Sequence, residues 1–284
     1  MNYSFTRYLA AKKTVDDRAL NGQVWEALAA ALQHLQSPHI LEVGAGIGTM
    51  VERLVARGVV RDGVVTAIDT VPENMAVAQT RLQALPASIQ LELEAIDLFD
   101  FIRREQGQRQ WDLVVAHAFL DLMDIAATLP LLFSLLRPDG WFYFTLNFDG
   151  ATILQPTIEA PFDAHVERLY HRTMDERVTA GKPSGDSRSG RHLFHHLRTA
   201  GAQILAAGSS DWVVFAGEGG YADDEAYFLH FIVETMRGAL VDHPELDRER
   251  FLDWIGQRQG QIEAGELVYI AHQLDFFGRV RGQG

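Results

Sequence analysis

The chain has 284 residues, of which 47% are hydrophobic and 22% charged, so it is long and apolar enough to bury a sizeable core. Its formal net charge of -13 disfavours non-specific binding to the phosphate backbone of nucleic acid. The absence of cysteine excludes thiolate nucleophiles, disulfides and thiolate metal sites. Because no apolar run has the length of a membrane span or of a signal-peptide core, we expect a cytoplasmic protein without a membrane partner.

Apolar runs of strand length alternate with amphipathic helical segments through the first half of the chain. An opening helix is predicted over residues 16–35, where Val24, Leu28 and Leu32 share one apolar face. Strands are predicted at residues 40–43, 64–68, 89–95, 113–116 and 141–146, with helices at 49–57, 73–85 and 121–136 between them. This order is typical of a mostly parallel sheet with helices on both faces.

The regular alternation stops after Leu146. Segment 147–190 is predicted to form a helix and a loop rich in Gly, Ser and Pro, and segment 217–265 to form two helices. The remaining elements are a helix near 189–200, a strand within 203–215 and a last strand at 267–277. We therefore expect an N-terminal arm, 1–36, followed by an α/β core, 37–284, with helical insertions at 147–190 and 217–265.

A glycine-rich turn, Glu42-Val43-Gly44-Ala45-Gly46-Ile47-Gly48, joins the first predicted strand to the next helix. Glycines in such a turn permit positive φ angles and a close approach of the backbone to a ligand. The dinucleotide-binding pattern Gly-x-Gly-x-x-Gly places its third glycine one residue later than Gly48, so the spacing does not fit it. The turn instead resembles the Glu/Asp-x-Gly-x-Gly-x-Gly motif of class I methyltransferases that depend on S-adenosylmethionine (AdoMet), with Glu42 as its acidic residue.

Two more carboxylates end the next two predicted strands. Asp69 is placed to accept hydrogen bonds from the ribose hydroxyls of an adenosine ligand, although a helix cap is an alternative role. In the family that the sequence resembles, the residue at the position of Asp97 binds the adenine amino group, and Ile96 and Leu98 suit the apolar contacts to the ring. The occurrence of Glu42, Asp69 and Asp97 at three successive strand ends favours a bound nucleoside over three solvated carboxylates.

The fourth predicted strand leads into His117-Ala118-Phe119, which resembles the family's loop beside the sulfonium and the substrate. The Asn/Asp-Pro-Pro-Tyr sequence of many enzymes that methylate DNA bases or exposed amides is absent, which favours a small-molecule acceptor. The resemblance implies that the cofactor is bound by Arg18, Glu42, Gly44, Ala45, Gly46, Gly48, Asp69, Thr70, Ile96, Asp97, Leu98, His117, Ala118 and Phe119.

Methyl transfer from a sulfonium is an in-line displacement, so the protein supplies mainly alignment and a water-poor pocket. A base is needed only where the attacking atom of the acceptor carries a proton, and His117 is the candidate, with packing beside the cofactor as its alternative role. Asn147, Asp149 and His171 are predicted to contact the substrate. His192 and His196 have no evident third ligand, so no metal site is expected.

The arm, 1–36, is rich in aromatic and basic residues. In related methyltransferases such a segment folds over the cofactor, so we expect the same here, with Tyr8 packing nearby. Arg18 is the predicted partner of the AdoMet carboxylate, because a guanidinium can grip a carboxylate with two parallel hydrogen bonds.

The resemblance as a whole implies a Rossmann-like, mostly parallel, seven-stranded sheet whose last strand is antiparallel. It also implies an enzyme that transfers the methyl group of AdoMet to a small molecule, leaving S-adenosylhomocysteine (AdoHcy), and a homodimer is compatible with the sequence. Two alternatives stay open. An NAD(P)-dependent oxidoreductase or epimerase is disfavoured by the glycine spacing and by the lack of a Tyr-x-x-x-Lys pair, whereas a non-catalytic module that binds the nucleoside would need the same residues.

Overall fold

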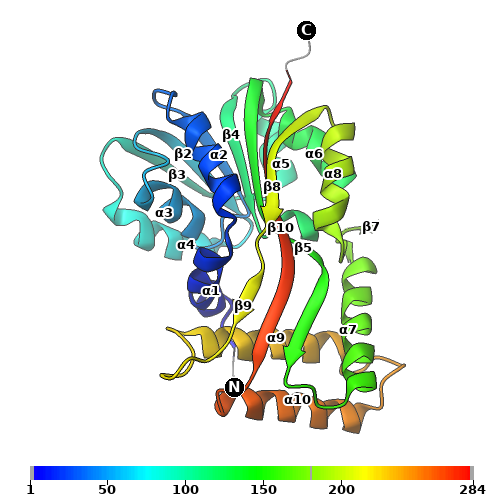
Figure 1. Ribbon diagram of the computed structural model, residues 1–284. Helices are drawn as coiled ribbons and strands as arrows, with labels where there is room; N and C mark the ends of the chain where they lie inside the picture. The colour runs from blue at the N-terminus through cyan, green and yellow to red at the C-terminus, as the bar shows by residue number, and fades with distance from the viewer. Residues whose placement is uncertain (1–2, 180, 282–284) are drawn as a thin grey trace.

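The computed structural model describes residues 3–179 and 181–281. Met1, Asn2 and residues 282–284, which the sequence analysis assigns to the arm and to the core, lie outside the described residues, as does Ala180 of the first predicted insertion. The described chain forms an α/β fold in which two long strands continue from a parallel sheet into a separate group of helices (Figure 1).

The sheet contains the predicted strands in the order β3-β2-β1-β4-β5-β10-β8. Their bounds are β1 (His39–Val43), β2 (Gly63–Asp69), β3 (Ile89–Ala95), β4 (Trp111–His117), β5 (Leu136–Gln155), β8 (Ala202–Ser209) and β10 (Val268–Val280). Strands β1 to β5 pair in parallel, and β10 is antiparallel to both β5 and β8. This confirms the predicted fold class with one addition, because a short strand, β9 (Trp212–Val214), also pairs with β10.

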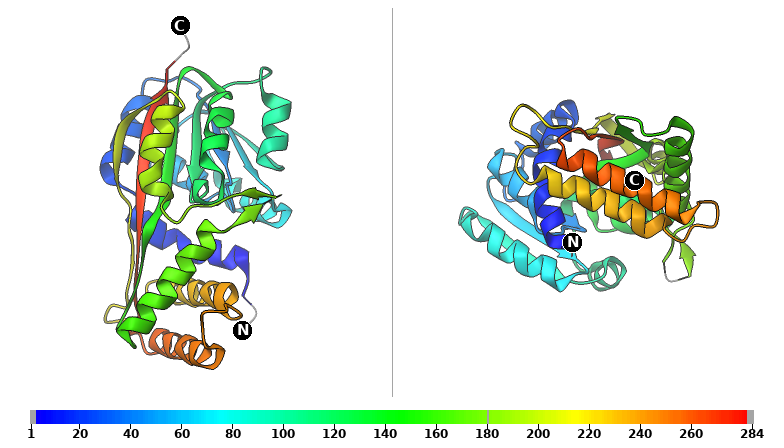
Figure 2. Two further views of the ribbon diagram at one scale, coloured as in Figure 1. Left: turned by 90° about the vertical axis from the view of Figure 1, so that its right-hand side faces the viewer. Right: turned by 90° about the horizontal axis from the view of Figure 1, so that it is seen from below.

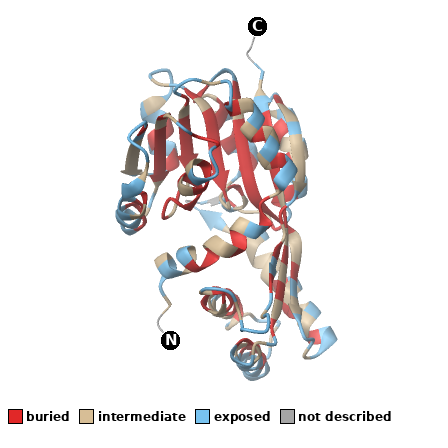
Figure 3. Ribbon diagram, turned by 60° about the vertical axis from the view of Figure 1, so that its left-hand side comes forward, coloured by how far each residue is buried: buried red, intermediate tan, exposed pale blue. Residues whose placement is uncertain are grey.

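Helices cover both faces of the parallel strands, as predicted. Those of one face are α2 (Gly22–Leu32), α3 (Thr49–Ala56) and α4 (Pro72–Arg81), and those of the other are α5 (Leu98–Glu105), α6 (Ile125–Phe133) and α8 (Ser189–Thr199). The minor elements are the 3-10 helices η1 (Leu82–Ala84) and η2 (Leu120–Leu122) and a hairpin of β6 (Val178–Thr179) with β7 (Lys182–Pro183). Buried residues therefore concentrate along the central strands (Figure 3).

The predicted opening helix, 16–35, is wrong in its extent, because the chain forms two helices there. Helix α1 (Phe5–Ala19) ends where Leu20 leaves the helical region, with φ -51° and ψ 127°. Asn21 then caps α2, since its side-chain oxygen accepts a hydrogen bond from the backbone N–H of Val24. The predicted helix 121–136 likewise shortens to α6, whose first turn is capped by Asp124.

Strand β5 is much longer than the predicted strand 141–146 and continues to Gln155. Its partner β10 pairs with it from Trp141 to Gln155, with register shifts near Leu146 and Gly150, whose φ angles are 54° and 74°. Because pairing resumes after each irregularity, the two strands form a ribbon that extends beyond the parallel sheet (Figure 2).

Four helices pack on this ribbon, and we call them the helical cap: α1, α7 (Ala160–Asp175), α9 (Glu225–Leu240) and α10 (Arg248–Glu263). They share an apolar core of their own, which includes Val15, Val166, Phe228 and Trp254. Helices α9 and α10 lie side by side at the end of the ribbon (Figure 2). The fold thus holds segments that are distant in sequence against the edge of the sheet at which the parallel strands end.

Candidate active site

A cavity of about 600 Å³ lies between the carboxyl ends of the parallel strands and the helical cap. The loops after β1, β2, β3 and β4 form one wall, which is the edge where open α/β sheets bind ligands. This wall contains most of the predicted cofactor-binding residues: Gly44, Ala45, Gly46, Asp69, Thr70, Ile96, Asp97, Leu98, His117, Ala118 and Phe119. Arg18, Glu42 and Gly48 do not line the cavity.

The glycine turn leaves no room for a side chain at its first glycine. Gly44 has φ 63°, and a Cβ built on it would lie 2.2 Å from Cδ2 of Phe119. Gly46, with φ 55°, donates its backbone N–H to Oδ2 of Asp69 over 2.9 Å. Gly48 has a different role, because it is the N-cap residue of α3 and a Cβ built on it would lie 2.8 Å from Cδ1 of Leu82. At Gly44 the turn therefore packs closely against the Phe119 ring, and both residues line the cavity.

The Asp69 carboxylate connects the glycine turn after β1 to the start of α4 and still has a site for one more hydrogen-bond donor. In addition to the Gly46 contact, its Oδ1 accepts hydrogen bonds from the Val71 backbone N–H at 2.9 Å and from Asn74 Nδ2 at 3.1 Å. A carboxylate has about four lone-pair sites. Three protein donors occupy Asp69, so about one site remains for a ligand hydroxyl rather than the two expected from the sequence.

Asp97 caps the N-terminus of α5 with one carboxylate oxygen, and its other oxygen accepts no hydrogen bond from the described residues. Its Oδ1 accepts hydrogen bonds from the backbone N–H groups of Phe99 and Asp100, at 2.8 and 3.3 Å, and so caps α5. Among the described residues, no donor bonds to Oδ2. Because Ile96 and Leu98 line the cavity on either side, Asp97 has a free acceptor between two apolar contacts.

Glu42 lies beneath the glycine turn rather than in the wall. It is 1% exposed, and its Oε2 has no hydrogen-bond partner among the residues that the structure describes. Burial raises the pKa of Glu42 to about 8, against the opposing effect of the Arg53 charge. The carboxyl is therefore mostly protonated at neutral pH, which makes it a neutral support of the turn.

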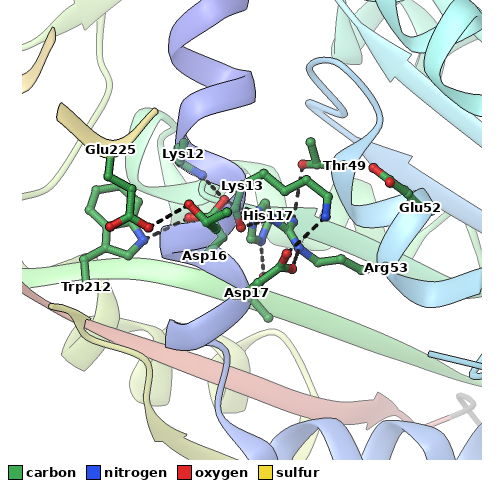
Figure 4. A network of polar contacts seen from close by, with 12 residues as sticks. Lys12, Lys13, Asp16, Asp17, Thr49, Glu52, Arg53, His117, Trp212 and Glu225 are labelled. Atoms are coloured by element: carbon green, nitrogen blue, oxygen red, sulfur yellow. Dashed lines mark hydrogen bonds and ion pairs between the residues drawn. The ribbon is translucent and has the colours of Figure 1, made fainter. Parts of the chain in front are cut away.

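His117 lines the cavity, yet protein contacts occupy both of its ring nitrogens. Nδ1 lies 2.8 Å from Oγ1 of Thr145. Nε2 lies 3.0 Å from Oδ2 of Asp16 (Figure 4). Burial, followed by the charge of Lys12, lowers the pKa of His117 to about 4. The neutral ring therefore donates from Nε2 to Asp16 and accepts at Nδ1 from the Thr145 hydroxyl. In this geometry neither nitrogen is free to take a proton from an acceptor.

Asp16 belongs to a buried ionic network that the sequence analysis missed. Its Oδ2 lies 2.6 Å from Lys12 Nζ, and its Oδ1 accepts a hydrogen bond from Trp212 Nε1 at 2.9 Å (Figure 4). Burial opposes ionisation of Asp16, but Lys12, His117 and Arg53 together lower its pKa below the usual value. Lys12 and Asp16 both line the cavity, so α1 contributes one cation and one anion to it. The spacing of four between them is the signal from which their pairing could have been predicted.

Arg18 lies outside the cavity, with its guanidinium on another carboxylate. Nη1 and Nη2 donate to Oε1 and Oε2 of Glu225 over 2.6 and 2.9 Å. Because Glu225 already accepts both of these hydrogen bonds, this geometry does not support the expected bidentate contact of Arg18 with the AdoMet carboxylate. The contact instead fastens α1 to α9.

The three predicted substrate contacts lie behind the cavity wall. Asn147 donates from Nδ2 to the carbonyl of Leu274 at 2.9 Å, and Asp149 is paired with Arg191, whose Nε lies 2.7 Å from its Oδ1. Both follow from the continuation of β5, which buries residues that the sequence analysis places at an open strand end. His171 also does not line the cavity, but its Nε2 is 2.9 Å from Oγ1 of Thr152, which does.

The wall opposite the nucleoside residues is aromatic and comes from the cap and the ribbon. Its members include Tyr8, Phe148, Thr152, Tyr170, Met174, Trp212, Phe231, Ile232, Tyr269 and Gln273. The part of the chain that the structure describes contains no cluster of three or more His, Asp or Glu side chains suited to a metal ion. Nor does any described helix combine the length and apolarity needed to cross a membrane.

Part of the chain is similar to known methyltransferases in sequence, and the whole chain is similar to them in fold. Residues 41–142 match the model of a family described as a methyltransferase domain. A putative methyltransferase from Bacillus halodurans is similar in structure, with a TM-score of 0.51 at 12% identity over 92% of this chain and 100% of the other. A SAM-dependent methyltransferase from Thiobacillus denitrificans, solved with S-adenosyl-L-homocysteine, gives a TM-score of 0.49 at 16% identity over 99% of this chain and 100% of the other.

The curated proteins contain no sequence that matches the chain. The matched segment begins within β1, contains the glycine turn, Asp69, Asp97 and His117, and ends within β5. Residues 41–142 are therefore similar to a methyltransferase domain, and the likeness to the Bacillus halodurans protein shows a shared fold.

Proposed function

We propose that the enzyme transfers the methyl group of AdoMet to a small-molecule acceptor that binds between the sheet edge and the helical cap. The observation that carries this proposal is one continuous cavity of about 600 Å³, with the strand-end loops that contain Gly44, Asp69 and Asp97 on one wall and the aromatic residues of the cap on the other. A cavity of this size is typical of small-ligand sites. AdoMet supplies an activated methyl group when bound, and the chain supplies its alignment with the acceptor.

Two features of the wall fit AdoMet. Gly44 lets the turn pack directly against Phe119 at the cavity wall, and Asp97 Oδ2 has no donor among the described residues. We assign the adenine amino group to Asp97 and a ribose hydroxyl to Asp69. The amino-acid end of AdoMet carries a carboxylate, and we assign it to Lys12 of α1, whose ammonium lines the cavity and has donors beyond the one that bonds Asp16.

The acceptor is assigned to the aromatic side of the cavity, and the cap limits its size. Residues of α1, α7 and α9 line the cavity across from the glycine turn, so an acceptor must fit beside the cofactor in the enclosed volume. This favours a small molecule over a nucleic acid or a protein. It also suggests why the chain contains the arm, 1–36, and the segments 147–190 and 217–265, which supply the helices of the cap.

Turnover of AdoMet tests this proposal. The purified protein is incubated with AdoMet and a panel of small amines, phenols, alcohols and carbon acids, and AdoHcy and the products are measured by mass spectrometry. We expect AdoHcy to form only when an acceptor is present, in amounts equal to a product one methyl group heavier. AdoMet that binds without turnover across the panel would instead support the non-catalytic nucleoside-binding module.

A further inference from the structure

Asp121 is a carboxylate on the cavity wall to which no other residue of the described chain donates a hydrogen bond. It follows the β4 loop, in η2, and lines the cavity. Its Oδ1 is buried and accepts no hydrogen bond from the described residues, none of which forms an ion pair with the carboxylate. An unpaired carboxylate is costly to bury, so a site that retains one is completed by a cationic or strongly donating ligand.

The surroundings of Asp121 are suited to a cation. Tyr8 and Tyr170 line the same cavity, and the charge of Asp121 helps to raise the pKa of both phenols, after the larger effect of burial. Tyr269 also lines the cavity, and burial, followed by the charge of an ionised Tyr170, raises the pKa of its phenol. The hydroxyls of these three tyrosines form no hydrogen bonds within the described chain. Aromatic faces attract ammonium groups, and a carboxylate beside them adds directional hydrogen bonds.

We propose that Asp121 binds the nitrogen of an amine acceptor and takes up its proton, so that the protein is an N-methyltransferase for small amines. The inference rests on the function proposed above and narrows its acceptor class. His117 is the other titratable ring on this wall, and its nitrogens are occupied by Thr145 and Asp16. Asp121 is therefore the group on the acceptor side with a free basic oxygen.

The chemistry requires no further reactant. The acceptor binds as an ammonium and gives one N–H proton to the Asp121 carboxylate, which leaves a lone pair on nitrogen. That lone pair forms the new N–C bond to the methyl group of AdoMet, while the C–S bond breaks and its electron pair stays on sulfur. The products are a methylated ammonium and AdoHcy, and the proton on Asp121 passes to solvent when they leave.

The proton transfer requires ionised Asp121, so activity depends on pH. Burial raises the pKa of Asp121 to about 6, and the charge of Arg177, a hydrogen bond from the Asp121 backbone N–H and the charge of Lys12 act against this rise. The titratable and charged groups of the same cavity that interact electrostatically with Asp121 are Lys12 and Tyr8 from α1, Tyr170 from α7 and Arg177 after α7. We therefore expect kcat/KM for an amine to increase as pH rises through about 6 and then to level, as the carboxylate loses its proton.

The test compares wild-type protein, Asp121→Asn and Asp186→Asn. Asp186 is a matched control, since it also lines the cavity but its carboxylate is already paired with His192 and the Arg188 backbone. Binding to each protein–AdoHcy complex is measured by calorimetry with pairs of small amines and the alcohols that have hydroxyl in place of amino. We expect wild type to prefer the amines, Asp121→Asn to lose about tenfold or more in amine affinity, and Asp186→Asn to stay within about twofold.

Turnover of the amines supplies a second readout. The rise of kcat/KM near pH 6 should disappear in Asp121→Asn and persist in Asp186→Asn. The inference is overturned if amines and alcohols give equal responses, including no response to either, or if Asp121→Asn keeps the amine preference. AdoHcy affinity is measured alongside and should be unchanged in both variants. Failure of wild type to bind AdoHcy would overturn the proposed function and this inference with it.

Discussion

Arg53→Ala is expected to lower the free energy of unfolding by about 3–5 kcal/mol, the range for removing one partner from a buried ion pair. The Arg53 side chain is 2% exposed, and its Nε lies 2.5 Å from Oδ1 of Asp17. Its Nη2 donates to the carbonyl of Lys13 at 3.1 Å and approaches Oδ2 of Asp16 at 3.5 Å (Figure 4). Alanine at this position would leave a buried carboxylate and a carbonyl without these donors and would release α1 from α3.

Arg57→Ala is the matched control for this loss. Arg57 also contacts Asp17, with Nη2 3.4 Å from Oδ1, but its side chain is 37% exposed. Because exposed ion pairs contribute little, we expect a loss of about 1 kcal/mol or less. Urea unfolding at neutral pH measures both variants against wild type. Equal losses in the two would show that burial of Arg53 does not make its contacts more stabilising than those of Arg57.

Gly44→Ala is expected to weaken AdoMet binding by about tenfold or more, which is a change of about 1.4 kcal/mol in binding free energy. A Cβ at this position would lie 2.2 Å from Cδ2 of Phe119, so the turn or the ring must move. Both line the cavity, and either movement changes the surface that the cofactor contacts. Calorimetric titration with AdoMet measures the effect directly.

Gly58→Ala separates this close approach from backbone strain. Gly58 has φ +70°, similar to φ +63° at Gly44, but a Cβ built there meets nothing within 4 Å. Both substitutions carry the strain of a left-handed alanine, about 1 kcal/mol or somewhat more. Only Gly44→Ala should also lose AdoMet affinity. If Gly58→Ala binds AdoMet as weakly as Gly44→Ala, the loss reflects general destabilisation and the turn is not a contact surface.

The sequence is most informative where function depends on residues close together in the chain. The glycine turn, Asp69 and Asp97 each follow directly on a strand, and parallel strands end at one edge of a sheet, so their convergence could be predicted from local order. Their detailed bonding could not. The three donors to Asp69 are in the glycine turn and at the start of α4. The spacing of residues in the sequence does not specify how this turn and this helix end are oriented.

The opposite wall of the cavity depends on contacts between distant positions. Arg18 is separated from Glu225 by 207 positions, and Asp16 from His117 by 101. A single sequence can mark Arg18 as a potential carboxylate partner, but it cannot say which carboxylate the side chain reaches. Likewise, the prediction for Asn147 and Asp149 assumed that β5 ends at Leu146. Pairing with β10 extends the strand instead and buries both side chains.

The central claim is that the cavity beside the glycine turn is an AdoMet site, and ligand-dependent thermal unfolding tests it most directly. A ligand that binds only the folded state raises the melting temperature by mass action. We predict that AdoMet and AdoHcy raise the melting temperature of the wild-type protein in a saturable way and that NAD does not. Equal stabilisation by NAD, or no response to either AdoMet or AdoHcy, would contradict the account.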